Sequence, residues 1–344
     1  MITLALDAMG GDNAPALVVY GAQIALKEID DIKLIFFGNK EELIPLIKKA
    51  QIDESRIEIH HTEDKITNEM KPSVALRKGR NSSMGLAIKA VKDGQADCVV
   101  SAGNTGALMA LGLFGLRMLP GIDRPAIAAV MSAYERDCLM LDLGANAESS
   151  ARNLVEFASM GHVYAEAVMD VKSPRIGLLN IGAESGKGNK LIQDAHKILQ
   201  KDSLGINYVG FVEGDDIANG TVDVVITDGF TGNVSLKSIE GTLKASKKII
   251  ADEIKHSILA KIGLFIAQKA LRKAYKRVDP RRYNGAWLLG LNGVCVKSHG
   301  GTDEFGFYNA IKNAYSTTKK DLLPKMKAHL ESHQADYWIE EEGF

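Results

Sequence analysis

Positions 2–15 read Ile-Thr-Leu-Ala-Leu-Asp-Ala-Met-Gly-Gly-Asp-Asn-Ala-Pro, a short apolar run that leads directly into a turn rich in glycine and asparagine. Similar turns follow apolar runs at 101–107, 142–146 and 228–233. In an open α/β sheet, ligands bind beyond the carboxyl ends of the strands, where loops meet helix N-termini. We therefore expect the four turns to form one site. Helix starts lined by glycine favour an anion, and phosphate above all.

Short β-branched runs alternate with helical patterns through residue 240. The predicted strands are 2–7, 33–38, 57–60, 97–102, 126–131, 138–143, 175–181, 208–212 and 222–227. Near-continuously apolar strands separated by helices are typical of a mostly parallel sheet that is covered on both faces. We expect a three-layer α/β/α fold in which residues 1–330 form one large domain or two packed lobes. The acidic residues 331–344 are expected to form a C-terminal tail.

The pattern changes at about residue 241, where a helical protrusion is expected to run to 282, and residues 288–297 then return to strand. An apolar cluster spans 258–266, and Asp279 is the one acid among many cations between 255 and 282. A basic amphipathic helix can lie on an anionic membrane or meet an acidic partner. The alternative is a helix that buries its apolar face in a dimer interface, and one element can serve both purposes.

The composition is that of a globular protein, with 46% hydrophobic residues, 25% charged residues and a net charge of −1. This balance gives no reason to expect nucleic acid as a partner. Cys98, Cys138 and Cys295 lie in apolar runs without the spacing of metal ligands or of a disulfide framework. No apolar run has the 18 or so residues that a membrane span needs. We expect a cytoplasmic protein that contacts membranes only at its surface.

Residues 182–190, which read Gly-Ala-Glu-Ser-Gly-Lys-Gly-Asn-Lys, have the look of a nucleotide-binding loop. The Walker spacing fails, because three residues instead of four separate Gly182 from the Gly-Lys pair. Lys187 and Lys190 still bring two cations to a glycine-rich helix start, where an anion can bind. The alternative is a solvated loop with no ligand. The chain also lacks the glycine fingerprint of a dinucleotide site and the His-Glu-x-x-His pattern of a zinc site.

His299 ends a predicted strand and precedes Gly300 and Gly301, a position where catalytic side chains are often found. A purely structural histidine is the alternative. Cys295 lies inside an apolar run and is better explained as a core residue than as a thioester nucleophile.

With these turns the chain resembles the bacterial phosphate acyltransferases that act on acyl-carrier protein. The blocks that carry the resemblance follow one another in the family's order, at 7–15, 101–107, 141–146, 180–182, 210–214, 227–233, 285–290 and 299–300. The resemblance as a whole covers about residues 1–318. The chain departs from the pattern at 183–186, where related sequences tend to be more acidic.

The resemblance implies a reversible reaction in which acyl-[acyl-carrier protein] and inorganic phosphate give acyl phosphate, which feeds phospholipid synthesis, and the free carrier. It also implies a homodimer, a fold similar to the isocitrate and isopropylmalate dehydrogenases, and peripheral association with an anionic membrane. Phosphate is itself the nucleophile, so the chemistry requires no metal or redox cofactor. The alternatives are a phosphate acetyltransferase or an NAD-dependent dehydrogenase on the same fold, or a membrane-associated scaffold without activity.

The site residues are assigned by their positions in these turns. The catalytic residues are expected to be Asn104, Asn233, His299 and Asp228. Substrate and phosphate are expected to bind Asp7, Gly10, Gly11, Asn13, Ser101, Gly103, Thr105, Asn146, Lys187, Lys190 and Thr231. Contact with the carrier or the membrane is assigned to Ile258, Ile262, Phe265, Lys273, Lys276 and Arg277.

Overall fold

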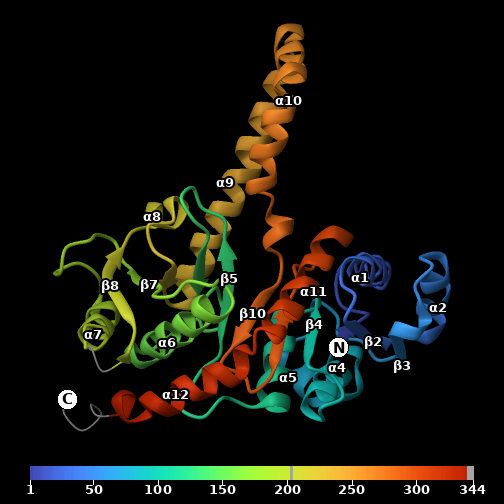
Figure 1. The fold of residues 1–344 in the computed structure, drawn as a ribbon, viewed down its shortest axis with the longest axis horizontal. Coiled ribbons are helices and arrows are strands. Elements are labelled where there is room, and N and C mark those ends of the chain that lie inside the picture. The colour runs from blue at the N-terminus through green and yellow to red at the C-terminus, as the bar shows by residue number, and fades with distance from the viewer. Residues whose placement is uncertain (202–203, 339–344) are drawn as a thin grey trace.

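An 11-stranded sheet runs through the computed structural model, which describes residues 1–201 and 204–338 (Figure 1). Its strand order is β3-β2-β1-β4-β11-β10-β5-β6-β9-β7-β8. The strands are β1 (Ile2–Asp7), β2 (Ile32–Gly38), β3 (Ile57–His61), β4 (Cys98–Ser101), β5 (Ala126–Met131), β6 (Cys138–Leu141), β7 (Arg175–Leu179), β8 (Asn207–Val212), β9 (Val224–Ile226), β10 (Ala286–Leu289) and β11 (Val294–Lys297). Each strand predicted before residue 240 is therefore present.

Helices connect these strands and cover the sheet. They are α1 (Ala16–Glu28), α2 (Lys40–Lys49), α3 (Pro72–Lys78), α4 (Ser83–Lys92), α5 (Thr105–Leu116), α6 (Ala151–Ala167), α7 (Lys190–Leu199), α8 (Gly214–Asn219), α9 (Gly229–Lys255), α10 (Ile258–Arg277), α11 (Glu304–Lys319) and α12 (Leu322–Trp338). Helix α12 takes in the first part of the expected acidic tail, and residues 339–344 lie outside the described residues.

Alternate side chains of each strand enter two separate cores, as expected for a sheet covered on both faces. Leu4 and Leu6 join the core formed with α1, α6, α11 and α12, whereas Ala5 joins the core formed with α4, α5 and the early turns of α9. The predicted three-layer α/β/α fold with a mostly parallel sheet is confirmed.

The segment predicted as one strand over 288–297 is a hairpin of two strands, β10 and β11. Gly290 breaks the run, because its φ of 93° is a conformation that side chains with a Cβ avoid. Strand β10 is antiparallel to both of its neighbours, and β5 is antiparallel to β6. As a result, β1, β4 and β11 run in one direction, whereas β6, β7 and β9 run in the opposite direction.

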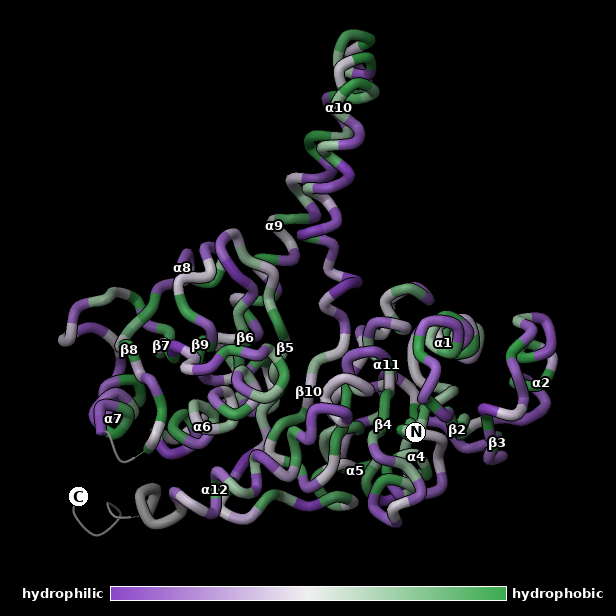
Figure 2. Tube along the Cα trace, in the orientation of Figure 1, coloured by the Kyte–Doolittle hydropathy of each residue, from purple (hydrophilic) through white to green (hydrophobic). Residues whose placement is uncertain are grey.

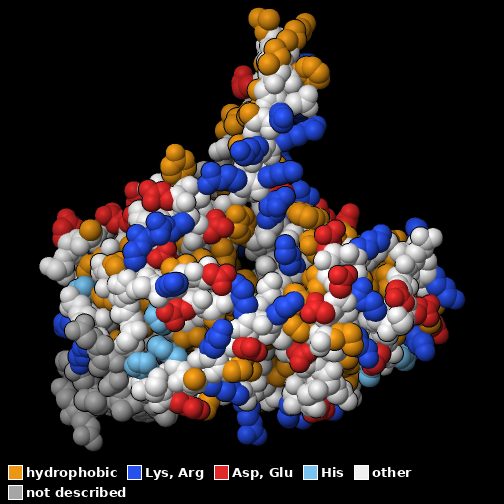
Figure 3. Space-filling view, viewed as in Figure 1, with side chains coloured by type: hydrophobic (Ala, Val, Ile, Leu, Met, Phe, Trp, Pro, Cys, Tyr) orange, Lys and Arg blue, Asp and Glu red, His pale blue; other side chains and the backbone are white. Residues whose placement is uncertain are grey.

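Helices α9 and α10 form a hairpin that projects far from the sheet (Figures 1 and 2). Asp228 caps the start of α9 and Ser257 caps the start of α10. Helix α10 has 20 residues, none of them buried. Figure 3 shows hydrophobic side chains at the tip of the hairpin and Lys and Arg side chains along its stem.

Candidate active site

A buried carboxylate organises the edge of the sheet at which β1, β4 and β11 end. Asp7, which ends β1, is only 1% exposed and accepts hydrogen bonds from Ser83 Oγ and Ser101 Oγ, each 2.6 Å long. Burial raises the pKa of the Asp7 carboxyl, and the two serine hydroxyls oppose the rise. A Cβ on Gly10 would lie 2.3 Å from Asp7 Oδ2 and 2.8 Å from the Gly103 nitrogen. Asp7 therefore shapes the turns from beneath and does not face the solvent.

The turns after β1, β4 and β11 pack against one another. Gly11 adopts a φ of 112°, and a Cβ there would meet Ala102 Cβ at 3.0 Å and Gly300 O at 3.4 Å. The Asp12 amide donates to Gly300 O over 3.0 Å, and Asp12 Oδ1 accepts from Asn68 Nδ2 over 2.9 Å. Asn13 is exposed beside them at the entry to α1. Three turns that are distant in the sequence thus form one surface.

Asn104 caps α5 at this surface. Its Oδ1 accepts from the Ala107 amide over 3.0 Å, and its Nδ2 donates to Asn68 O and Met70 O over 2.8 and 3.0 Å. Both amide hydrogens are therefore engaged, and the side chain anchors the helix start to the 67–70 loop. As at any helix start, the first amide groups of α5, beginning with Thr105, have no intrahelical carbonyl to bind and favour an anion.

His299 follows β11 and lies exposed at the same surface. Its backbone amide donates to Asn284 Oδ1 over 2.9 Å. Its Nδ1 accepts from the Gly301 amide over 3.1 Å, which places the ring hydrogen of a neutral imidazole on Nε2. The Nε2–H group is therefore a donor at the edge of the sheet.

Helix α9 brings further charge to this edge. Burial lowers the pKa of His299, Glu240 raises it, and Lys297, Lys237 and Lys244 lower it. Lys237 and Lys244, which both belong to α9, therefore lie close enough to His299 to affect its pKa. The ring remains neutral near pH 7, and its surroundings attract an anion.

Lys297 ends β11 with its side chain half-buried. Its ammonium donates to Ser298 O and, over 3.5 Å, to Ala102 O. Burial lowers the pKa of Lys297 to about 8, although Asp7 and Asp12 act in the opposite direction.

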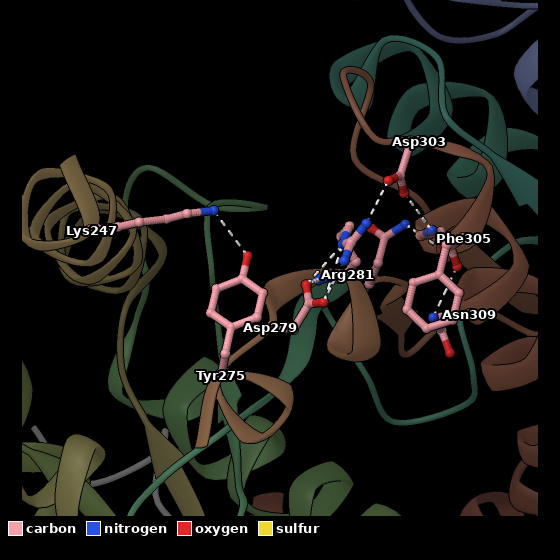
Figure 4. Close-up of polar contacts among 9 residues, drawn as sticks. Lys247, Tyr275, Asp279, Arg281, Asp303, Phe305 and Asn309 are labelled. Atoms are coloured by element: carbon pink, nitrogen blue, oxygen red, sulfur yellow. Dashed lines mark hydrogen bonds and ion pairs between the residues drawn. The ribbon is translucent and has the colours of Figure 1, made fainter. Parts of the chain in front are cut away.

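The stem of the hairpin is attached beside this edge by ion pairs (Figure 4). Arg281 donates to Asp279 and to Asp303, over 2.7 Å in each case, and so joins the end of the hairpin to the start of α11. Lys247 Nζ donates to Tyr275 Oη over 3.2 Å and links α9 to α10.

A second group of predicted residues follows strands β6, β7 and β9. Asp142 is fully buried and accepts from the amides of Gly144, Ala145 and Asn146 over 3.1, 2.9 and 2.8 Å. Asn146 Nδ2 donates to Asp142 Oδ2 over 3.0 Å and to Pro125 O over 2.8 Å. These bonds close the turn after β6 upon itself.

Helix α9 begins against this turn. Asp228 accepts from the Thr231 amide and hydroxyl over 2.9 and 2.7 Å, and Asn233 Nδ2 donates to Leu143 O over 3.0 Å. The loop with the exposed Lys187 and Lys190 follows β7. These residues follow strands that run opposite to β1, β4 and β11, because β10 and β6 each pair antiparallel with a neighbour. Helix α9 joins the two groups, since it starts at this turn and its Lys237 and Glu240 lie close enough to His299 to act on its pKa.

Comparison with known proteins agrees with the resemblance seen in the sequence. The model of a family described as "Fatty acid synthesis protein" matches residues 2–325. A protein of Paramagnetospirillum magneticum named "Phosphate acyltransferase" is 52% identical over 90% of this chain and 88% of its own length. A relative of the same name from Rhodospirillum centenum is 51% identical over 96% of this chain and 95% of its own length. The chain belongs to the phosphate acyltransferase family.

Solved structures show that the phosphate acyltransferase chain has a known fold. A phosphotransacetylase from Streptococcus pyogenes superposes with a TM-score of 0.64 at 17% identity, over 92% of this chain and 94% of that one. A branched-chain phosphotransacylase from Enterococcus faecalis gives a TM-score of 0.58 at 16% identity, over 92% and 99% of the two chains.

Two residues of this candidate site, Lys297 and Ser83, were not predicted from the sequence. Lys297 is a cation at the end of the otherwise apolar strand β11, directly before the Ser-His-Gly turn, and that position was the signal that could have identified it. Ser83 belongs to α4, and its contact with Asp7 joins residues 76 positions apart. No local sequence pattern predicts a contact between residues so far apart in the chain.

Proposed function

We propose that this chain transfers a fatty acyl group from acyl-[acyl-carrier protein] to inorganic phosphate, releasing acyl phosphate and the free carrier. Family membership supports acyl transfer to phosphate, and the carrier as the acyl donor is the further step. The observation that supports the location most strongly is the joined set of glycine turns, which lies at the N-terminus of α5 beside His299. Thr105 and Gly106 at the start of α5 would hold the phosphate there through backbone amides, whereas the Gly103 amide donates to Ser101 Oγ over 3.0 Å and supports the turn.

The proposed site matches the demands of the reaction. Phosphate must be held close to the thioester carbonyl, and such positioning can contribute roughly 7–11 kcal/mol to lowering the barrier. Negative charge then develops on the carbonyl oxygen, where a positioned donor contributes about 2.7–4 kcal/mol. The Nε2–H group of His299 is such a donor, because its ring is neutral and its Nδ1 is already engaged.

We assign a supporting role to Asn146, Asp228, Thr231 and Asn233. Their hydrogen bonds fix the start of α9 to the turn after β6. The direction of α9 in turn places Lys237 and Lys244 beside His299. These residues would then affect turnover through the helix and not through the substrate.

The projecting hairpin is proposed to contact an anionic membrane and the acidic carrier. Ile258, Ile262 and Phe265 are 76%, 53% and 73% exposed, which suits shallow insertion among lipids. The last part of α10, nearer the sheet, carries cations, among them Lys273, Lys276 and Arg277. No helix in the described part of the chain could span a bilayer. We propose a cytoplasmic protein that associates peripherally with membranes.

A homodimer is part of the proposal. Phe230 and Val234 near the start of α9 are 67% and 50% exposed. Apolar side chains on a helix surface of this kind are suited to contact with a second copy.

The test is to incubate the purified protein with an acyl-carrier-protein thioester and phosphate and to measure acyl phosphate. We expect acyl phosphate and free carrier thiol in equal amounts, both dependent on phosphate. Release of thiol at the same rate without phosphate would identify a thioesterase instead. A parallel reaction with acetyl-coenzyme A tests the alternative donor, and faster turnover of that substrate would overturn the carrier assignment.

A further inference from the structure

Lys297 occupies the junction of the turns that form the proposed site. Its ammonium binds the carbonyl oxygens of Ala102, which follows β4, and of Ser298, which follows β11. An ammonium has three hydrogens, so one remains after these two bonds. The Lys297 ammonium, with one hydrogen left to donate, therefore lies where the ends of β4 and β11 meet the start of α5.

The groups around Lys297 come from three elements. Asp7 on β1 and Asp12 in the following turn favour its charged form, whereas Lys237 on α9 and the burial of its side chain favour the neutral form. Together they bring its pKa to about 8, well below that of a solvated lysine. A group with a pKa close to the working pH is the most effective general acid or base.

The other polar groups of the site are less suited to donating a proton. Asp7 accepts hydrogen bonds from Ser83 and Ser101 and is buried beneath the turns. His299 is a neutral imidazole whose ring hydrogen can stabilise an oxyanion, but a neutral imidazole is a very weak acid. A departing alkyl thiolate, in contrast, takes up a proton near pH 7, since thiols of this kind have pKa values of about 8.5, and a nearby acid can supply that proton as the C–S bond breaks.

We infer, on the basis of the proposed function, that Lys297 is the general acid that protonates the departing carrier sulfur. A phosphate oxygen forms a bond to the carbonyl carbon, and the electron pair of the breaking C–S bond moves to sulfur. The ammonium gives its proton to that sulfur and becomes an amine. The amine then recovers a proton from the hydroxyl that the phosphate brought as hydrogen phosphate. The products are the acyl phosphate dianion and the carrier thiol, and Lys297 is charged again.

The test compares two thioesters of the same acyl group, one with N-acetylcysteamine and one with thiophenol. The alkyl thiolate is the stronger base and gains more from protonation as it leaves, whereas the aryl thiolate is a weaker base and gains little. We expect Lys297→Met to slow the alkyl substrate by about a hundredfold or more and the aryl substrate far less. The decline of kcat above about pH 8 in the wild type should disappear in the variant. Lys297→Arg, which keeps the charge but holds its proton too tightly, should show the same selective loss.

The control is Lys244→Met, which removes a cation on α9 that acts on His299 and should slow both thioesters to the same degree. Equal losses for both thioesters in the Lys297 variants, with the alkaline decline retained, would overturn the inference and leave Lys297 as a structural or phosphate-holding residue. Circular dichroism establishes that each variant is folded. If the wild type forms no acyl phosphate, the proposed function fails. If the wild type is active and only the selective loss is missing, the inference alone fails.

Discussion

At the residue scale, the site depends on a carboxylate that never reaches the solvent. Asp7 binds a hydroxyl from α4 and a hydroxyl from the end of β4, and Gly10 packs directly over it. The turn that would hold the anion is therefore held in place from below. Small changes in volume at this point should be transmitted to the backbone amides.

Gly10→Ala is expected to impair both stability and activity. The added methyl group would lie 2.3 Å from Asp7 Oδ2 and 2.8 Å from the Gly103 nitrogen, and the carboxylate is held by hydrogen bonds from Ser83 and Ser101. Overpacking of this kind costs about 1–3 kcal/mol of unfolding free energy, which denaturant unfolding would measure beside acyl phosphate formation. Gly214→Ala is the matched control, because a Cβ at Gly214 would meet nothing within 4 Å. Equal stability of the two variants would contradict this packing argument.

The sequence predicts the positions of Asp7 and His299 because each ends an apolar run before glycine. It does not predict how Asn104 is used. Pattern alone cannot show that Asn68 and Met70 would take both amide hydrogens of that side chain. Lys297 was not predicted as a site residue, because a single lysine at the end of a strand usually lies in solvent.

At the element scale, the strand directions decide which turns meet. The runs that become β5 and β6 are mostly apolar, and buried parallel and antiparallel strands give the same apolar pattern. Nothing in the sequence therefore shows that the direction reverses between β11 and β6. The strands themselves were predictable from their composition, but their directions were not.

The hairpin of α9 and α10 supports a prediction about membrane binding. Ile262→Glu combined with Phe265→Glu should abolish flotation with anionic vesicles, because it places two charges on the apolar tip, while turnover of soluble acyl-carrier protein remains. Leu243→Glu combined with Leu271→Glu adds the same charge on the stem and should retain flotation. Unchanged flotation of the tip variant, together with its conversion to a monomer in sedimentation, would identify the tip as a dimer contact instead.

At the scale of the whole molecule, the last two long helices tie the halves of the sheet together. Helix α11 packs on α1, and α12 crosses to pack on α6 (Figure 1). Three histidines lie at the second contact, with ring centroids 5.3 Å apart for His162 and His329 and 4.4 Å apart for His329 and His333. Burial and the two neighbouring histidines lower the pKa of His329 to about 4.

This cluster should make the folded protein sensitive to acid. A histidine whose pKa is lower in the folded state destabilises the fold as soon as the unfolded chain begins to bind protons. The stability is therefore complete above about pH 6.5 and is lost progressively as the pH falls toward 4. Thermal unfolding between pH 8 and pH 5 should show this decline, and His329→Leu should make it shallower. The exposed His256→Gln is the control and should follow the wild type.

Helix α9 is a single helix of 27 residues, roughly 40 Å long at 1.5 Å per residue. One end is fastened to the turn after β6, its middle passes beside His299, and its far end carries the projecting tip. One continuous helix thus spans the distance between the outermost point of the molecule and the charged side chains that surround His299.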